Sequence, residues 1–159
     1  MRCTIYTDGS FRKTTKGGIY GCGIFALFEG VAEPVRMQWA DNNSDWAAMW
    51  NIAGELCAVL GFMDFIDKEF PEYNEIDIYY DQTGVEDWVT GKQKATRPQT
   101  LLYRDTMRTY METYKISFHH VNSHKSVSEG GAVGNHEADA LAKEAVNEFA
   151  RERGIVFDA

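Results

Sequence analysis

The sequence predicts an α/β fold built on a five-stranded mixed sheet that is flanked by helices. Three strand-like segments joined by short links open the chain, which is typical of an antiparallel meander. Helix-like and strand-like segments then alternate up to the C-terminus, as in βαβ units with parallel strands. Because crossovers between parallel strands are right-handed, the first, fourth and fifth strands should lie side by side.

The expected meander strands are residues 2–9, 19–28 and 31–39. Glycines precede the second segment, and Glu29-Gly30 supplies a turn signal between the second and the third. Pro34 has no backbone N–H to donate to a neighbouring strand. The third strand should therefore lie at an edge of the sheet.

The rest of the chain is expected to form a long helix, a strand, two helices, a strand and a final helix, over residues 45–68, 76–80, 83–90, 98–114, 116–121 and 135–152. In the first helix, apolar residues from Met49 to Ile66 recur at helical spacing. Its N-cap is expected at Ser44 or a neighbour. Gly91 suits the end of the second helix, and Pro98 suits the first position of the third.

The composition fits one ordinary folded domain over residues 1–159. Hydrophobic residues make up 44% of the chain and aromatic residues 13%, which suits a compact core and argues against disorder. No apolar run approaches a membrane span and no signal peptide opens the chain, so we expect a cytoplasmic protein without a membrane partner. A monomer is expected as well, without a sequence feature that carries it. The spacing of Cys3, Cys22 and Cys57 is not metal-like and suits inert packing in a reducing compartment.

Two carboxylates stand where strands of the predicted sheet end. Asp8 follows the first strand-forming run, and Asp81 directly follows the fourth strand. Ligands of open α/β sheets bind outside the carboxyl ends of the strands, so these two side chains can meet if their strands are adjacent and parallel. An Asp before Gly-Ser is also a common turn residue, and this alternative stays open from the local sequence alone.

Two further carboxylates lie on predicted helices. Glu55 stands at the margin of the apolar stripe of the long helix, where it is either a solvated flank residue or turned toward a site. Asp139 lies on the final helix. Oxygen ligands of this kind suit Mg²⁺, and four of them suit two ions that clamp the attacking and leaving oxygens of a phosphodiester. The alternative is four unrelated surface acids.

The net charge of −8 counts against a nonspecific nucleic-acid binder, which usually presents a basic surface. Divalent cations held by several carboxylates would return positive charge where substrate phosphates lie. The charge alone therefore leaves nucleic acid possible but unsupported.

Five motifs, in order and over nearly the whole chain, resemble those of type 1 ribonuclease H. They are Tyr6-Thr7-Asp8-Gly9-Ser10, Asn51-Ile52-Ala53-Gly54-Glu55-Leu56, Tyr79-Tyr80-Asp81, Val121-Asn122-Ser123-His124 and the stretch from Gly134 to Lys143. The stretch from Asp87 to Ala95 resembles family members that lack a long basic handle, with Gln93 where an aromatic residue is common. The resemblance implies a ribonuclease H-like fold.

The resemblance also implies an activity, which is hydrolysis of the RNA strand of an RNA–DNA hybrid to give 5′-phosphate and 3′-hydroxyl ends. It implies two Mg²⁺ ions, for which Mn²⁺ would substitute, and it matches the metal ligands to Asp8, Glu55, Asp81 and Asp139. His124 matches the family's histidine that assists proton transfer or product release, although a histidine in a polar loop is more often simply solvated.

Substrate contacts are expected from residues next to these motifs and from the chain's compact basic run, namely Gly9, Ser10, Asn51, Gln82, Lys92, Lys94, Thr96 and Arg97. Gly9 and Ser10 would let the substrate backbone approach Asp8 closely. Asn51 and Gln82 would reach the minor groove, where 2′-hydroxyls distinguish RNA from DNA. The basic run would contact phosphates of the DNA strand without reading sequence, or it is only a solvated loop.

Three features depart from the family pattern. Gln82 follows Asp81 at once, whereas the family more often places such a glutamine one residue later. The link from His124 to Asp139 is longer than the short form. His136 stands where a glutamate is usual, and it is either a partner of Asp139 or a surface residue.

Two other functions fit parts of this pattern. One is another nuclease of the same fold, such as a junction resolvase or an integrase-like strand-transfer domain. The other is a non-catalytic nucleic-acid-binding domain on the same scaffold, which would not need all four acids.

Overall fold

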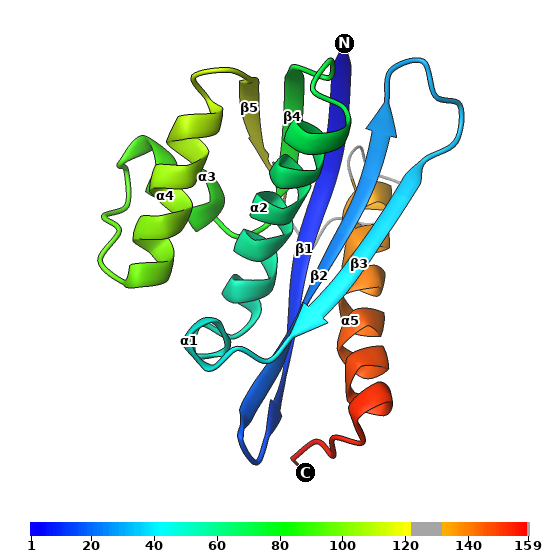
Figure 1. Ribbon diagram of the computed structural model, residues 1–159, viewed down its shortest axis with the longest axis vertical. Helices are drawn as coiled ribbons and strands as arrows, with labels where there is room; N and C mark the ends of the chain where they lie inside the picture. The colour runs from blue at the N-terminus through cyan, green and yellow to red at the C-terminus, as the bar shows by residue number, and fades with distance from the viewer. Residues whose placement is uncertain (122–131, 159) are drawn as a thin grey trace.

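The computed structural model describes residues 1–121 and 132–158, and within them a five-stranded sheet lies between helices (Figure 1). The strands are β1 (Arg2–Thr14), β2 (Gly17–Phe28), β3 (Val35–Asp41), β4 (Glu75–Tyr80) and β5 (Lys115–His120). The helices are α1 (Ser44–Ala47), α2 (Asn51–Glu69), α3 (Gly84–Thr90), α4 (Pro98–Tyr110) and α5 (Ala132–Arg153).

The strand order is β3-β2-β1-β4-β5, which confirms the predicted architecture. β1, β2 and β3 pair antiparallel, whereas β4 and β5 run parallel to β1. β3 lies at an edge, as Pro34 predicted, and it begins just after that proline at Val35 rather than at residue 31.

The first strand is longer than expected. Its parallel pairing with β4 ends at the pair Tyr6 and Tyr79, but its antiparallel pairing with β2 continues to Thr14 and Gly17. β2 thus supplies hydrogen-bonding partners beyond the point where β4 stops. Asp8 therefore lies inside a strand that has already lost its parallel neighbour, and it is not a turn residue.

The predicted helix over residues 45–68 is two helices. The Asn43 side chain caps α1 by accepting the backbone N–H groups of Asp45 (3.1 Å) and Trp46 (3.3 Å). The chain then breaks at Trp50, whose φ of 59° lies in the left-handed region. Such a conformation costs about 1–3 kcal/mol in a residue with a side chain. The apolar pattern runs on through this break, so the sequence could not reveal it.

α2 packs on one face of β1 and β2, and α5 packs on the other face over β1, β2 and β3 (Figure 1). The main core lies on the α2 side, and its largest fully buried side chains include Ile5, Ile78, Leu56, Phe62 and Tyr103. Cys3 and Cys22 are buried in this core. Burial raises the pKa of the Cys3 thiol to about 12, which suits inert packing. None of the described helices is long and apolar enough to cross a membrane.

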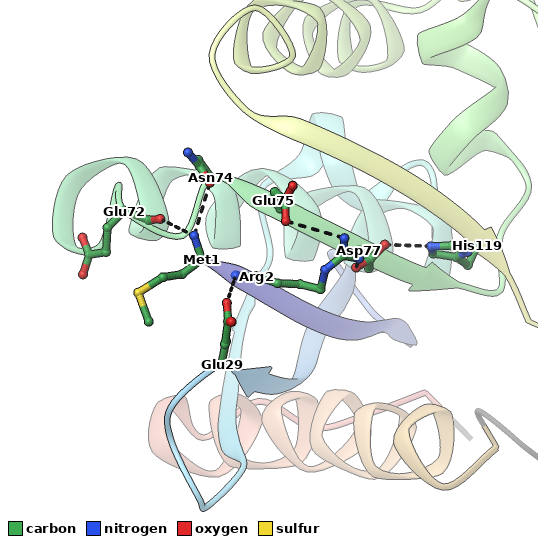
Figure 2. Close-up of polar contacts among 8 residues, drawn as sticks. All are labelled: Met1, Arg2, Glu29, Glu72, Asn74, Glu75, Asp77 and His119. Carbon is green, nitrogen blue, oxygen red and sulfur yellow. Dashed lines mark hydrogen bonds and ion pairs between the residues drawn. The ribbon is translucent and has the colours of Figure 1, made fainter.

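A charged network fixes the start of β1 against its parallel neighbours (Figure 2). The Met1 ammonium donates to the Glu72 carbonyl (3.1 Å), and the Arg2 guanidinium pairs with Glu75 (3.5 Å) and Asp77. Asp77 also pairs with His119 Nε2 at 3.0 Å. Burial acts to raise the pKa of Asp77, but the hydrogen bonds from His119 and Arg2 outweigh burial and lower it.

Candidate active site

Asp8 projects from the middle of β1 on the face that α5 covers. Its Oδ1 accepts the backbone N–H of Gly9 at 2.8 Å. Burial, together with the nearby carboxylates of Asp139 and Asp81, raises the pKa of this carboxyl to about 7 against the opposing hydrogen bond from Gly9. Asp8 thus lies among negative charges that a bound cation would neutralise.

Glu55 is buried, with 3% of its surface exposed, so it is not a solvated flank residue of the helix. Its Oε1 accepts the backbone N–H of Asp81 at 3.0 Å, and its Oε2 accepts that of Gln82 at 3.2 Å. The Thr7 hydroxyl donates to Oε1 at 3.4 Å. Burial and the charge of Asp8 raise the pKa of Glu55 well above its ordinary value.

The burial of Glu55 depends on two glycines that let α2 lie directly on the sheet. A side chain at Gly9 would collide with the backbone of Asn51 and Glu55. A side chain at Gly54 would collide with the backbone of Gly21 and Gly9. The space on the Cβ side of Gly9 is thus filled by α2, so this glycine serves helix packing, and its contact with substrate stays a prediction.

Asp81 comes directly after Tyr80, the last residue of β4. Its backbone N–H is held by Glu55, and its carbonyl is hydrogen-bonded to His120 Nε2 at 2.8 Å. The adjoining residue Gln82 is half-buried, and its N–H is also bound by Glu55. Glu55 of α2 and His120, the last residue of β5, therefore fix the backbone that carries the Asp81 carboxylate.

Asp139 lies on α5 with 36% of its side chain exposed, and its Oδ2 accepts Lys143 Nζ at 2.9 Å. This hydrogen bond raises the pKa of Lys143. His136, one turn earlier, is exposed, as expected for a surface residue. Glu137 pairs instead with Arg36 of β3 at 3.2 Å.

The four carboxylates come from β1, α2, the end of β4 and α5, and the pKa of Asp8 or Glu55 responds to the charge of each of the other members. Within the described ranges, however, no group of three or more His, Cys, Asp or Glu side chains is arranged to hold a metal ion. The carboxylates of Glu55 and Asp139 already accept hydrogen bonds from other groups of the protein. The donor set nevertheless fits hard divalent cations, because every ligand atom is a carboxylate oxygen. His124 lies outside the described residues.

The basic run forms one wall of a hollow of about 410 Å³, called here the basic-loop hollow. Its lining includes Lys94, Thr96 and Arg97 together with Ala48, Trp50 and Trp88. Lys92 is exposed and does not line it. The other expected contacts lie nearer the carboxylates, with Asn51 exposed at the start of α2 and Ser10 half-buried on β1.

Three residues of this region were missed by the sequence reasoning. Lys143 stands four residues after Asp139, a helical spacing that already predicts an ion pair. Thr7, which supports Glu55 from β1, has no such signal in the sequence. Neither has Trp50, whose position in the wall of the basic-loop hollow depends on the break between α1 and α2.

Comparisons with known proteins agree with this fold. RNase H1 from the halophilic archaeon Halobacterium salinarum superposes with a TM-score of 0.68 at 22% identity, over 93% of this chain and 99% of that chain. LC11-RNase H1, solved in complex with an RNA/DNA hybrid, superposes with a TM-score of 0.71 at 16% identity, over 93% and 99%.

The N-terminal RNase H domain of a Mycobacterium tuberculosis protein gives a TM-score of 0.67 at 16% identity, over 94% of this chain and 98% of that chain. No curated protein sequence matches this chain significantly. At these identities the solved structures establish the fold alone. The family is established by the sequence profile for RNase H, which matches residues 1–147. The chain therefore belongs to the RNase H family and is a ribonuclease H enzyme.

Proposed function

We propose that this enzyme is an endonuclease that hydrolyses the RNA strand of RNA–DNA hybrids with two divalent metal ions, giving 5′-phosphate and 3′-hydroxyl ends. The observation that carries the proposal is the environment of Asp8. Its carboxyl is largely buried, its pKa is raised to about 7, and the carboxylates of Asp139 and Asp81 contribute to that rise. Such a site stores charge repulsion that cations would relieve.

The residues that would hold the ions are Asp8, Glu55, Asp81 and Asp139, with Mg²⁺ as the expected cation and Mn²⁺ as a substitute. When bound, the ions supply an activated water and positive charge beside the leaving oxygen. The chain itself contributes by holding the ligands in position. Glu55 holds the Asp81 backbone at 3.0 Å, so two ligands from different elements are fixed relative to each other before substrate arrives.

The hybrid would lie across this site and the basic-loop hollow. Lys92, Lys94, Thr96 and Arg97 are proposed to contact phosphates of the DNA strand, and three of them line that hollow together. Ser10, Asn51 and Gln82 are proposed to meet the RNA strand in its shallow minor groove. His124 is proposed to assist proton transfer or product release. We further propose that the enzyme acts as a cytoplasmic monomer.

Cleavage of matched substrates tests the proposal. The purified enzyme should cut an RNA–DNA hybrid in Mg²⁺ or Mn²⁺, leave single-stranded and double-stranded RNA intact, and give product ends that are 5′-phosphate and 3′-hydroxyl. Preferential cutting of a four-way junction would instead support a junction resolvase. Tight hybrid binding without any cutting would support a non-catalytic domain.

A further inference from the structure

Trp50 combines two unusual features, strain and exposure. Its φ is 59°, and among the described residues it is the one non-glycine with a positive φ. Its surface is 65% exposed, although tryptophan is usually well buried. Glycine would adopt this backbone without strain, yet the chain places its largest side chain here. A strained residue that keeps a large exposed ring is a reason to look for a ligand.

The ring has an aromatic neighbour. It stacks on Phe11 of β1 with 6.4 Å between ring centroids and 27° between ring planes. Trp50 lies three residues after the end of α1 and directly precedes Asn51, whose backbone packs against Gly9 beside Asp8. The stacking on Phe11 and the backbone link to Asn51 therefore place the ring at the edge of the candidate active site.

Trp50 separates two hollows. On one side is the basic-loop hollow of about 410 Å³. On the other is a hollow of about 510 Å³, called here the hairpin hollow, whose lining includes Phe11, Lys13, Gly17 and Ser44. Trp50 and Ala48 line both. In Figure 1, α1 lies between the β1–β2 hairpin and the loop that joins α3 to α4. Both volumes lie within the range of small-ligand sites.

Each hollow carries positive charge in a protein whose net charge is −8. Lys13 lines the hairpin hollow, whereas Lys94 and Arg97 line the basic-loop hollow. Among the described residues, none of these three side chains takes part in an ion pair. An aromatic ring flanked by unpaired cations is the combination that binds single-stranded nucleic acid, because bases stack on the ring while cations meet the phosphates.

We propose that Trp50 is a stacking platform for an unpaired nucleotide, and that the enzyme binds hybrids with a single-stranded extension through the two hollows. The base faces inside a duplex are covered by neighbouring base pairs, so a protruding ring can stack only on an unpaired base or on the last base pair at a duplex end, and an unpaired base can also reach the flanking cations. The extension would then run from the basic-loop hollow over Trp50 into the hairpin hollow, toward Lys13. This inference rests on the proposed hybrid substrate and adds a site for its unpaired end.

Binding of matched hybrids tests the inference. The Asp8→Asn chain, used because its cleavage should be at least about tenfold slower, is titrated with a blunt hybrid, the same hybrid with a DNA extension, and the same hybrid with an RNA extension. At least one extension should tighten binding by roughly five- to hundredfold, as expected for stacking of a base on an aromatic ring. The two extended substrates show which strand supplies the unpaired nucleotide.

Four substitutions in the Asp8→Asn chain distinguish the contribution of the Trp50 ring to binding from effects on folding. Trp50→Ala and Trp50→Gly should both abolish the preference for the extension, although the glycine variant relieves the backbone strain and should melt at a higher temperature than the alanine variant. Trp50→Phe should keep part of the preference. Leu102→Ala, which removes another exposed apolar side chain (54% exposed) on α4, should keep all of it.

Equal binding of blunt and extended hybrids would overturn the inference, as would a Trp50→Gly chain that weakens both equally, since the ring would then contact the duplex. Failure of the proposed function is distinguished by cleavage, because the wild-type enzyme would then leave a blunt hybrid uncut.

Discussion

The Glu55 carboxylate accepts the backbone N–H of Asp81 at 3.0 Å, so α2 is tied to the end of β4. The tie joins two candidate metal ligands that are 26 residues apart in the sequence. It also explains why the glutamate is buried, since a carboxylate away from water needs hydrogen-bond donors. Glu55 is thus both a structural link and a candidate metal ligand.

Replacing Glu55 with glutamine should separate the two roles. Burial and Asp8 raise the pKa of Glu55, which means that the ionised form destabilises the folded state. Glu55→Gln removes the charge and keeps one acceptor oxygen, so its melting temperature should rise while hybrid cleavage in Mg²⁺ falls at least about tenfold. Calorimetry and cleavage rates on the same preparation check this. A less stable variant would show that the hydrogen bonds outweigh the charge.

Gly9→Ala should damage both stability and activity. The added methyl group would collide with the backbone of Asn51 and Glu55, so α2 must move away from β1. Overpacking of this kind typically costs about 1–3 kcal/mol, and here it also displaces Glu55. Denaturant unfolding and cleavage assays measure both effects. Ser10→Ala on the next residue is the control and should unfold like the wild type; equal behaviour of the two variants would contradict the packing argument.

Lys143→Ala should lower the metal concentration needed for half-maximal cleavage. Lys143 occupies Asp139 Oδ2 at 2.9 Å, and an exposed pair at this helical spacing contributes about 0.3–0.5 kcal/mol. The metal concentration needed for half-maximal cleavage should therefore fall about twofold. The matched control is Lys68→Ala, which breaks the pair with Asp64 (3.1 Å) at the same spacing on α2. A Lys143→Ala chain that needs more metal would show that the ammonium supports the site.

The stabilising effect of Asp77 should disappear in acid. Contacts with His119 and Arg2 lower its folded-state pKa, so the carboxylate stabilises the fold at pH values above the unfolded pKa of about 3.9. That contribution is lost as pH falls through the lower, folded-state pKa. Asp77→Asn should be less stable by about 1.5–3 kcal/mol at neutral pH. Unfolding curves over a pH series should converge for the two chains in acid; a constant gap would contradict this account.

The sequence predicted the sheet well because its order follows from chain connectivity. Once the meander and the crossovers are recognised, β1, β4 and β5 must be neighbours, and Asp8 and Asp81 come to one side of the sheet. The positions of Glu55 and Trp50 depend on tertiary packing instead. Helical phase put Glu55 at the margin of α2, but Gly9 and Gly54 let the helix approach until that margin is buried.

The break at Trp50 was equally hidden, because the apolar spacing runs on from α1 into α2 and tryptophan rarely adopts a positive φ. The extension of β1 beyond Asp8 was missed for a related reason. Arg12 and Lys13 read as loop residues, but β2 continues to pair with them at Ile19 and Gly18. In each of these cases the local structure depends on contacts with another helix or strand, which the local sequence does not reveal.

The most direct measurement is the rate at which the Asp8→Asn enzyme cleaves an RNA–DNA hybrid in Mg²⁺. The substitution removes one charge from a crowded set of carboxylates, so the variant should fold and melt at least as well as the wild type. We predict that its cleavage rate falls at least about tenfold. A folded variant that keeps more than about a tenth of the wild-type rate would contradict the four-carboxylate, two-metal account.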